Sequence, residues 1–340
     1  MSTIVPFRKH ASLPAIPGPR DVAAAWLDSL APNTKLAYGK DLADFAGFLM
    51  SITPDAWADS ELNPEVLATF RRCPDRRAAS ELLWAIGNGT ANALATAYAT
   101  SMDERKLASA TIARRLTALR SIVAYGRRVG RIVWTLDVKS PPVVRYRDVR
   151  GPGKAEWKAL AADARSEASK GTAKARRDLA ILLLMGDRGI RRAEVVGLDY
   201  PVDFDRDGSA VWILGKGRRA KERLTINART LAAMVDFLAS RGTAPGPFFT
   251  RLDRAAKGPT RLTDWSVWWI TRQAGRRTGL ARDVRPHELR HESITDALDQ
   301  GYDVRDVRQF SRHAKLDTVL LYDDRRTDVA GEITRSLGGE

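Results

Sequence analysis

Helical periodicity of apolar residues runs along most of this chain and is clearly broken at one place, residues 139–153. That stretch contains Ser-Pro-Pro, several arginines and Gly-Pro-Gly, a combination that cannot easily continue a helix. We therefore expect it to be a linker between two domains, and a length of 340 residues suits two domains. Residues 1–19 are rich in proline and lack periodicity, so we expect a flexible N-terminal arm there.

The segment 20–138 is predicted to be an all-helical, basic domain. Asn33 is expected to cap a helix over 33–50, and Asn63-Pro64 to open one that ends near Arg72. An Ala-rich helical segment follows over 75–102, weakened near two glycines. Ser109–Arg128 is the strongest helix of this part, with arginines on the faces outside its apolar stripe of Ile112, Leu116, Leu119 and Val123.

The segment 154–325 is predicted to be a second, mostly helical domain with a small antiparallel sheet. Its convincing strands are Ala210–Leu214 and 222–227, which flank the sequence GKGRRAK. In the tail, 326–340, Val329, Ile333 and Leu337 recur every four residues and form one narrow apolar stripe on a helix. The predicted fold class is therefore mainly α.

Charge and cysteine content limit the partners. Lys and Arg number 56 against 41 Asp and Glu, a net charge of +15, which indicates a polyanionic partner such as DNA, RNA or an anionic membrane surface. No apolar run approaches the length of roughly 20 residues that spans a bilayer, and the N-terminus lacks a signal-peptide pattern. The single cysteine, Cys73, rules out an intrachain disulfide and a cysteine zinc site, and a reducing cytoplasm fits best. Nucleic acid is then the expected partner.

Three patterns imitate familiar sites. The stretch 203–208 begins like a calcium loop, but the twelfth position is Leu214 instead of a bidentate Glu, so we expect a turn. The stretch 215–220 matches a dinucleotide-binding glycine pattern, but a strand-like segment follows it where a helix is required. Neither a metal nor a nucleotide cofactor is predicted. The third pattern is a helical spacing of tryptophans, for which we predict burial in the core: Trp265, Trp268 and Trp269.

Chemistry-bearing residues gather near the end of the chain. Three of the four histidines fall within 27 residues, among a dense run of arginines. His287 and Arg290 are three residues apart and share a helix face. His313 follows Arg290 by 23 residues, and Tyr322 comes nine residues later.

This segment resembles the second conserved box of the tyrosine recombinases, or phage integrases. That pattern reads His-x-x-Arg-His, then a helix ending in Gly, then a His, then a Tyr about nine residues later. Gly189-Ile190-Arg191 with Glu194 resembles the first box, and Gly215-Lys216-Gly217 resembles the catalytic lysine hairpin. In the first half, stretches from Asn33 and Thr111 look like the core-binding helices of the family. The resemblance covers about 20–325 and implies a helical, SAM-like core-binding domain and a catalytic domain that close on DNA as a C-shaped clamp.

The resemblance also implies roles for individual residues. Tyr322 would be the nucleophile, and Arg191 and Arg290 would bind the phosphate, whose developing charge two guanidiniums can neutralise. The remaining roles would be filled by His287 as general base, His313 as a donor to the phosphate and Lys216 as the acid for the departing 5′ oxygen.

The chain departs from the family pattern at several points. The hairpin is two residues longer than usual, which leaves Lys221 as an alternative acid. Arg312 replaces the usual Gly before the second His, and Glu292 stands where a small residue is usual. His291 is interpreted as structural.

We therefore expect a site-specific DNA recombinase that works through a 3′-phosphotyrosine, as a tetramer on two double-stranded DNA sites. Neither ATP nor a metal is required, and accessory proteins are left open. A type IB topoisomerase and a DNA-binding regulator on the same fold are the alternatives; a covalent DNA adduct would exclude the regulator, and product topology would separate the two enzymes. Whether the tail docks on its own domain or on a neighbouring protomer also stays open.

Overall fold

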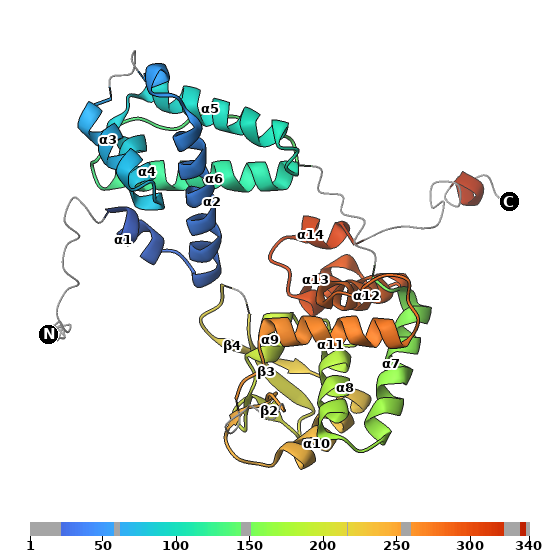
Figure 1. The fold of residues 1–340 in the computed structure, drawn as a ribbon. Coiled ribbons are helices and arrows are strands. Elements are labelled where there is room, and N and C mark those ends of the chain that lie inside the picture. The colour runs from blue at the N-terminus through green and yellow to red at the C-terminus, as the bar shows by residue number, and fades with distance from the viewer. Residues whose placement is uncertain are drawn as a thin grey trace, which may run out of the picture. The chain divides into compact units, whose positions relative to one another are not determined.

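The computed structural model describes residues 22–57, 62–143, 151–215, 217–252, 260–322 and 334–337. The predicted arm, half of the predicted linker and most of the predicted tail lie outside these ranges, as does Lys216. The chain divides into two compact units, 1–145 and 146–340. The fold is mainly helical, as predicted (Figure 1). Within the described ranges, no helix combines the length and apolar character needed to cross a membrane.

The first unit consists of helices in its described part. In chain order they are α1 (Val22–Asp28), α2 (Pro32–Ser51), the short 3₁₀ helix η2 (Pro54–Trp57), α3 (Pro64–Arg72), α4 (Arg76–Ala85), α5 (Asn88–Glu104) and α6 (Ser109–Arg128).

Most of the helices predicted for this unit are present in the structure. Helix α6 has the predicted bounds, and the side chain of Asn63 caps α3 by accepting from Glu65 N at 2.8 Å. The cap predicted at Asn33 is wrong: α2 begins one residue earlier, at Pro32, because proline suits the first helical turn. The Ala-rich segment forms two helices, which separate at Ile86 and Gly87.

A core of large side chains joins these helices. Phe45 of α2 packs edge-on against Tyr98 of α5, with ring centroids 5.1 Å apart, and both are fully buried. Beside them, Arg115 of α6 pairs with Asp44 of α2 at 2.5 Å, and Arg114 pairs with Asp41. Part of the basic face of α6 is therefore neutralised within the unit.

The second unit carries the remaining elements. They are α7 (Gly153–Ser169), α8 (Ala173–Gly186), α9 (Arg192–Val196), β1 (Asp199–Tyr200), β2 (Phe204–Asp205), β3 (Ala210–Leu214), β4 (Lys221–Thr225), α10 (Ala228–Arg241), β5 (Gly246–Pro247), α11 (Asp264–Arg277), α12 (Pro286–Asp299), α13 (Val304–Ser311) and α14 (Leu316–Leu320).

Two small antiparallel sheets lie in this unit. Strands β2, β3 and β4 form one, and Leu214 pairs with Lys221 next to the connecting turn. The predicted strand 210–214 is exact, and the second begins one residue earlier and ends two residues earlier than predicted. The pair β1 and β5 was not predicted, because strands of two residues carry no readable alternation.

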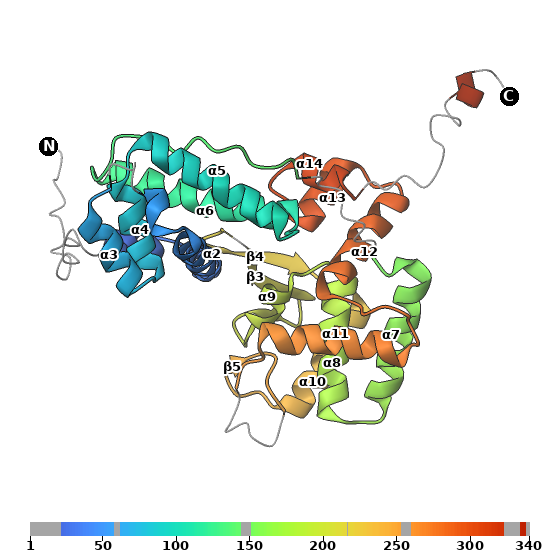
Figure 2. The same ribbon diagram turned by 45° about the horizontal axis from the view of Figure 1, so that its top comes forward.

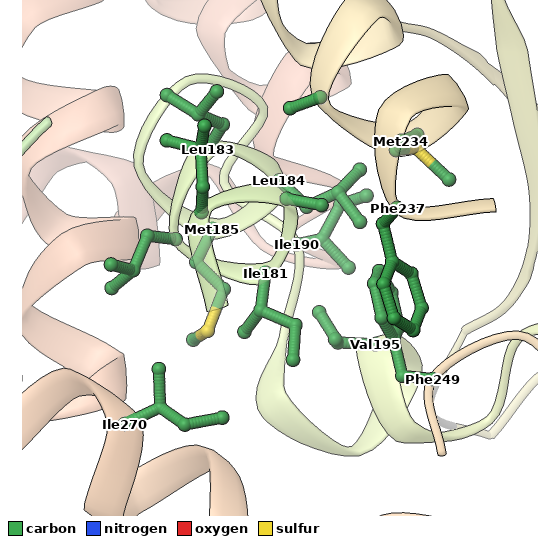
Figure 3. Packing of buried hydrophobic residues seen from close by; sticks show 14 of the residues in the cluster. Ile181, Leu183, Leu184, Met185, Ile190, Val195, Met234, Phe237, Phe249 and Ile270 are labelled. Atoms are coloured by element: carbon green, nitrogen blue, oxygen red, sulfur yellow. The ribbon is translucent and has the colours of Figure 1, made fainter. Parts of the chain in front are cut away.

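Helix α8 is the centre of the second unit. Figure 3 shows its Ile181 and Leu184 among side chains from several other elements. Phe237 of α10 stacks on Phe249 at 5.6 Å, and both rings are fully buried. Both ribbon views place α7 and α11 against α8, and α13 and α14 beside α12 (Figures 1 and 2).

The predicted burial of the tryptophan stripe is wrong. Trp265 is 64% exposed and Trp269 is 39% exposed, and their rings stack on each other 5.6 Å apart. Helix α11 instead buries the face that carries Val267, Ile270 and Ala274. Both faces have helical spacing, so periodicity alone could not decide which one the core would take.

Candidate active site

Helix α12 brings the histidine-arginine box to the site. Pro286 occupies its first turn, and the Glu288 side chain accepts from Arg285 N at the helix start. His287 is exposed, whereas Arg290, one turn later, is only 1% exposed. The two residues therefore lie at different depths in the site.

Backbone carbonyls fix the Arg290 guanidinium. Its Nη1 donates to Gly189 O and its Nη2 to Ser311 O, which ties α12 to the first box and to the end of α13. Gly189 adopts φ +65°, and a Cβ there would lie 2.6 Å from Ser293 Oγ, so this position requires glycine. Burial first, and then the charges of Arg191 and Arg312, lower the pKa of Arg290 to about 10.

A turn at the end of α13 aims His313 at Arg290. Arg312 adopts the left-handed conformation, and His313 N donates to Arg308 O at 3.3 Å. Arg290 Nη2 then lies 3.3 Å from His313 Nε2, and Ser311 Oγ lies 3.0 Å from Nδ1. Burial and the charges of Arg290 and Arg191 lower the pKa of His313 to about 4, so its imidazole is neutral at pH 7.

Tyr322 follows α14 and is buried against two histidine rings. Its ring stacks on His291 with centroids 3.9 Å apart, and it lies 5.4 Å from the ring of His313. Burial raises the pKa of Tyr322, although the charges of Arg290 and Arg191 act in the opposite direction. The phenol is therefore protonated before any reaction.

Arg191 stands at the N-terminus of α9 and is partly exposed. The Glu194 carboxylate accepts from Arg191 N at 2.9 Å and from its Nη1 at 3.1 Å. The Arg191 side chain keeps 30% exposure, while that of Glu194 keeps 4%. The positive charge of Arg191 is near enough to lower the pKa of both Arg290 and Tyr322.

The two lysine candidates differ. Lys216, between β3 and β4, lies outside the described residues. Lys221 binds both carboxylate oxygens of Asp203, at 2.6 and 2.7 Å, and that carboxylate is almost fully buried. Lys221 is therefore held in an ion pair at the base of β4.

The structure thus brings Arg290, His313 and Tyr322 together, with the charge of Arg191 nearby. His287 is the more peripheral histidine: its ring meets His291 edge-on at 5.6 Å. The described residues hold no group of three or more His, Cys, Asp or Glu side chains placed for a metal ion.

The site also includes residues that the sequence did not assign to it. His291 contacts Tyr322 directly, although the sequence assigned it a structural role. Ser311 and Arg312 adjoin His313 and complete the hydrogen bonding of the site. The only signal for Arg312 was its replacement of the usual Gly.

Comparison with known proteins identifies the family. The phage integrase family model matches residues 156–328. A tyrosine recombinase of Synechococcus elongatus is 34% identical over 91% of this chain and 90% of its own length. One from a Synechocystis species is 33% identical, covering 91% of this chain and 92% of its own length.

Solved structures share the fold. The Tn1549 transposon integrase in complex with transposon right end DNA aligns with a TM-score of 0.63 at 12% identity, covering 94% of this chain and 99% of that one. The XerH recombinase bound to a palindromic difH substrate aligns with a TM-score of 0.56 at 14% identity, covering 91% and 98%. Together with the family match and the close relatives, these findings show that this chain belongs to the phage integrase family, the tyrosine recombinases, which break and rejoin DNA.

Proposed function

We propose that this recombinase cleaves double-stranded DNA by attack of the Tyr322 hydroxyl on a backbone phosphate. The attack forms a 3′-phosphotyrosine bond and releases a 5′ hydroxyl. The 5′ hydroxyl of a second strand can then attack the phosphotyrosine, which rejoins the DNA and frees the tyrosine. The observation that carries this proposal is the cluster of a buried tyrosine, a buried arginine and a neutral histidine on three neighbouring elements.

Arg191 and Arg290 are proposed to hold the phosphate. Attack adds negative charge to the non-bridging oxygens, and fixed guanidiniums stabilise that charge without reorganising. Arg290 is suited to this because two carbonyls fix its plane. Burial first, and then repulsion from Arg191 and Arg312, lower the pKa of Arg290, and a bound anion would relieve that repulsion.

His313 is proposed as an uncharged donor to the phosphate. In this structure Arg290 Nη2 faces Nε2, so the ring proton belongs on Nδ1, facing Ser311. Donation from Nε2 requires the other tautomer, which the Ser311 hydroxyl accommodates by donating to Nδ1 instead. His287 is proposed as the base that takes the tyrosine proton, since the raised pKa of Tyr322 means that the proton leaves only during attack.

Lys216 is proposed as the acid that protonates the departing 5′ oxygen. The ion pair between Lys221 and buried Asp203 supports this choice over Lys221, because breaking it would leave a buried carboxylate without its cation.

DNA is the partner, and we propose a tetramer on two sites as the working assembly. The solved neighbours described above are recombinases bound to DNA, and the net charge of +15 suits the same partner. The relatives named above are recombinases or integrases, which favours strand exchange over topoisomerase or regulator activity. Accessory proteins and docking of the tail on a neighbouring protomer belong to this proposal.

The test uses a library of nicked duplexes that trap covalent intermediates. The wild-type protein is expected to form an adduct that survives a denaturing gel, and sequencing the attached DNA would give the target. Tyr322→Phe keeps the ring and its stacking on His291, so it should bind DNA normally and form no adduct. An adduct on the variant would mean that another residue is the nucleophile.

A further inference from the structure

Arg312 has a backbone conformation that is less favourable for arginine than for glycine. It adopts φ 59° and ψ 37° at the end of α13, in the left-handed region, which is disfavoured for residues other than Gly and Asn. A non-glycine residue persists in such a conformation when its side chain makes compensating interactions. The Arg312 side chain makes such interactions, with Glu194 and with Glu222.

The Arg312 guanidinium joins the two elements around the site. Its Nη2 donates to Glu194 Oε2 at 2.6 Å and its Nη1 to Glu194 Oε1 at 3.2 Å, a two-pronged pair with α9. The same Nη1 lies 3.1 Å from Glu222 Oε1 on β4. The side chains of Arg312 and Glu194 are 6% and 4% exposed, so this is a buried pair.

Glu194 is shared between two arginines. Its oxygens accept from Arg191 as well as from Arg312. Burial alone would raise the pKa of Glu194, but the hydrogen bond and charge of Arg312, with help from Arg191, lower it below its usual value. Arg312 thus neutralises much of a carboxylate that would otherwise be balanced by Arg191 alone.

We propose that Arg312 is a positioning residue that, by occupying Glu194, leaves the Arg191 guanidinium oriented and available for the DNA phosphate. Through Glu222 it also binds β4. The inference rests on the proposed role of Arg191 in cleavage and adds a residue that the family pattern lacks at this position. Arg312 itself does not touch DNA in this proposal.

The test compares Arg312→Gly with Arg312→Lys. Glycine removes the side chain and also the backbone penalty, whereas lysine keeps the charge but cannot form the two-pronged pair. Ser209→Gly is the matched control, because Ser209 also has a positive φ, of 48°, and lies immediately before β3. Each variant is assayed for folded fraction by circular dichroism, DNA affinity, and single-turnover adduct formation over a range of DNA concentrations.

We expect Arg312→Gly to lower the saturating cleavage rate by about 10- to 100-fold, because small misplacements of a catalytic group cost this much. The half-saturating DNA concentration should change by less than about threefold, because Arg312 does not touch DNA in this proposal and acts on the transition state. Arg312→Lys should recover part of the rate, and Ser209→Gly should cleave like the wild type. Should Arg312→Gly fail to fold, Arg312→Lys decides alone, with a saturating rate at least about threefold below wild type expected.

A wild-type saturating rate in the deciding variant would overturn the inference. So would a loss confined to the half-saturating DNA concentration, since Arg312 would then be a binding charge. Failure of the proposed function looks different: the wild type would form no adduct, or Tyr322→Phe would form one. The wild type could form an adduct and Tyr322→Phe none, while Arg312→Gly cleaves at the wild-type saturating rate. That outcome would refute the role of Arg312 and leave the proposed function standing.

Discussion

Replacing Arg290 by glutamine should separate the chemistry of this side chain from its part in stability. Burial and neighbouring cations lower the pKa of Arg290 from its usual value to about 10, so its charged form is disfavoured by about 3 kcal/mol, which the variant recovers. Against this, the Gly189 and Ser311 carbonyls lose their donors, at about 1–3 kcal/mol for each one left unsatisfied, and the glutamine amide can replace one donor.

These two contributions oppose each other. The free energy of unfolding of Arg290→Gln should therefore change by less than about 2 kcal/mol. Cleavage should respond far more, because the lost guanidinium stabilises charge that develops on the phosphate, and removal of one such donor costs about 10²- to 10³-fold in rate. Single-turnover adduct formation at saturating DNA and urea unfolding of the same preparation would measure both quantities.

Arg176→Gln is the control for loss of one positive charge. Arg176 lies on α8, where it donates to Ser240 Oγ at 2.8 Å, and its removal should leave the cleavage rate at the wild-type value. A rate for Arg290→Gln within a few-fold of wild type would refute the phosphate-binding role. A loss of more than about 4 kcal/mol in stability would refute the balance of burial and hydrogen bonding worked out above.

Three further predictions concern pH, salt and the tail. Because the pKa of His313 is about 4 in the folded protein and near 6.5 when unfolded, stability should fall as pH drops from 6.5 to 4. Halved for partial solvent exposure, this amounts to about 1–2 kcal/mol, and His313→Gln should lose that much less over the same window in urea titrations. DNA affinity should fall by at least about 100-fold between 50 and 200 mM salt as counterions are released, and a flat dependence in a fluorescence titration would contradict the DNA-binding proposal. Deleting residues 327–340 should spare binding to one DNA site and impair two-site assembly in gel shifts; normal two-site assembly would leave the tail as a local cap.

Local sequence was sufficient where a signal is contained within a few neighbouring residues. The apolar stripe of Ser109–Arg128 predicted that helix to the residue, and the short apolar run Ala210–Leu214 predicted that strand. The order of the boxes around Arg191, His287 and Tyr322 was enough to predict the family, because each box is a short motif with fixed internal spacing. These features depend on chain geometry that repeats every turn or every second residue.

Tertiary structure alone decided which partner each side chain meets. Two faces of α11 had helical spacing, and the core took Val267 and Ile270 while leaving Trp265 exposed. His291 faces Tyr322 only because α12 and the segment after α14 pack together. Arg312 reaches Glu194 across 118 positions of sequence. Sequence spacing fixes the face on which a side chain stands, but the depth of burial, the shared carboxylate and the resulting pKa shifts arise only when distant elements pack, since each depends on atoms from another part of the chain.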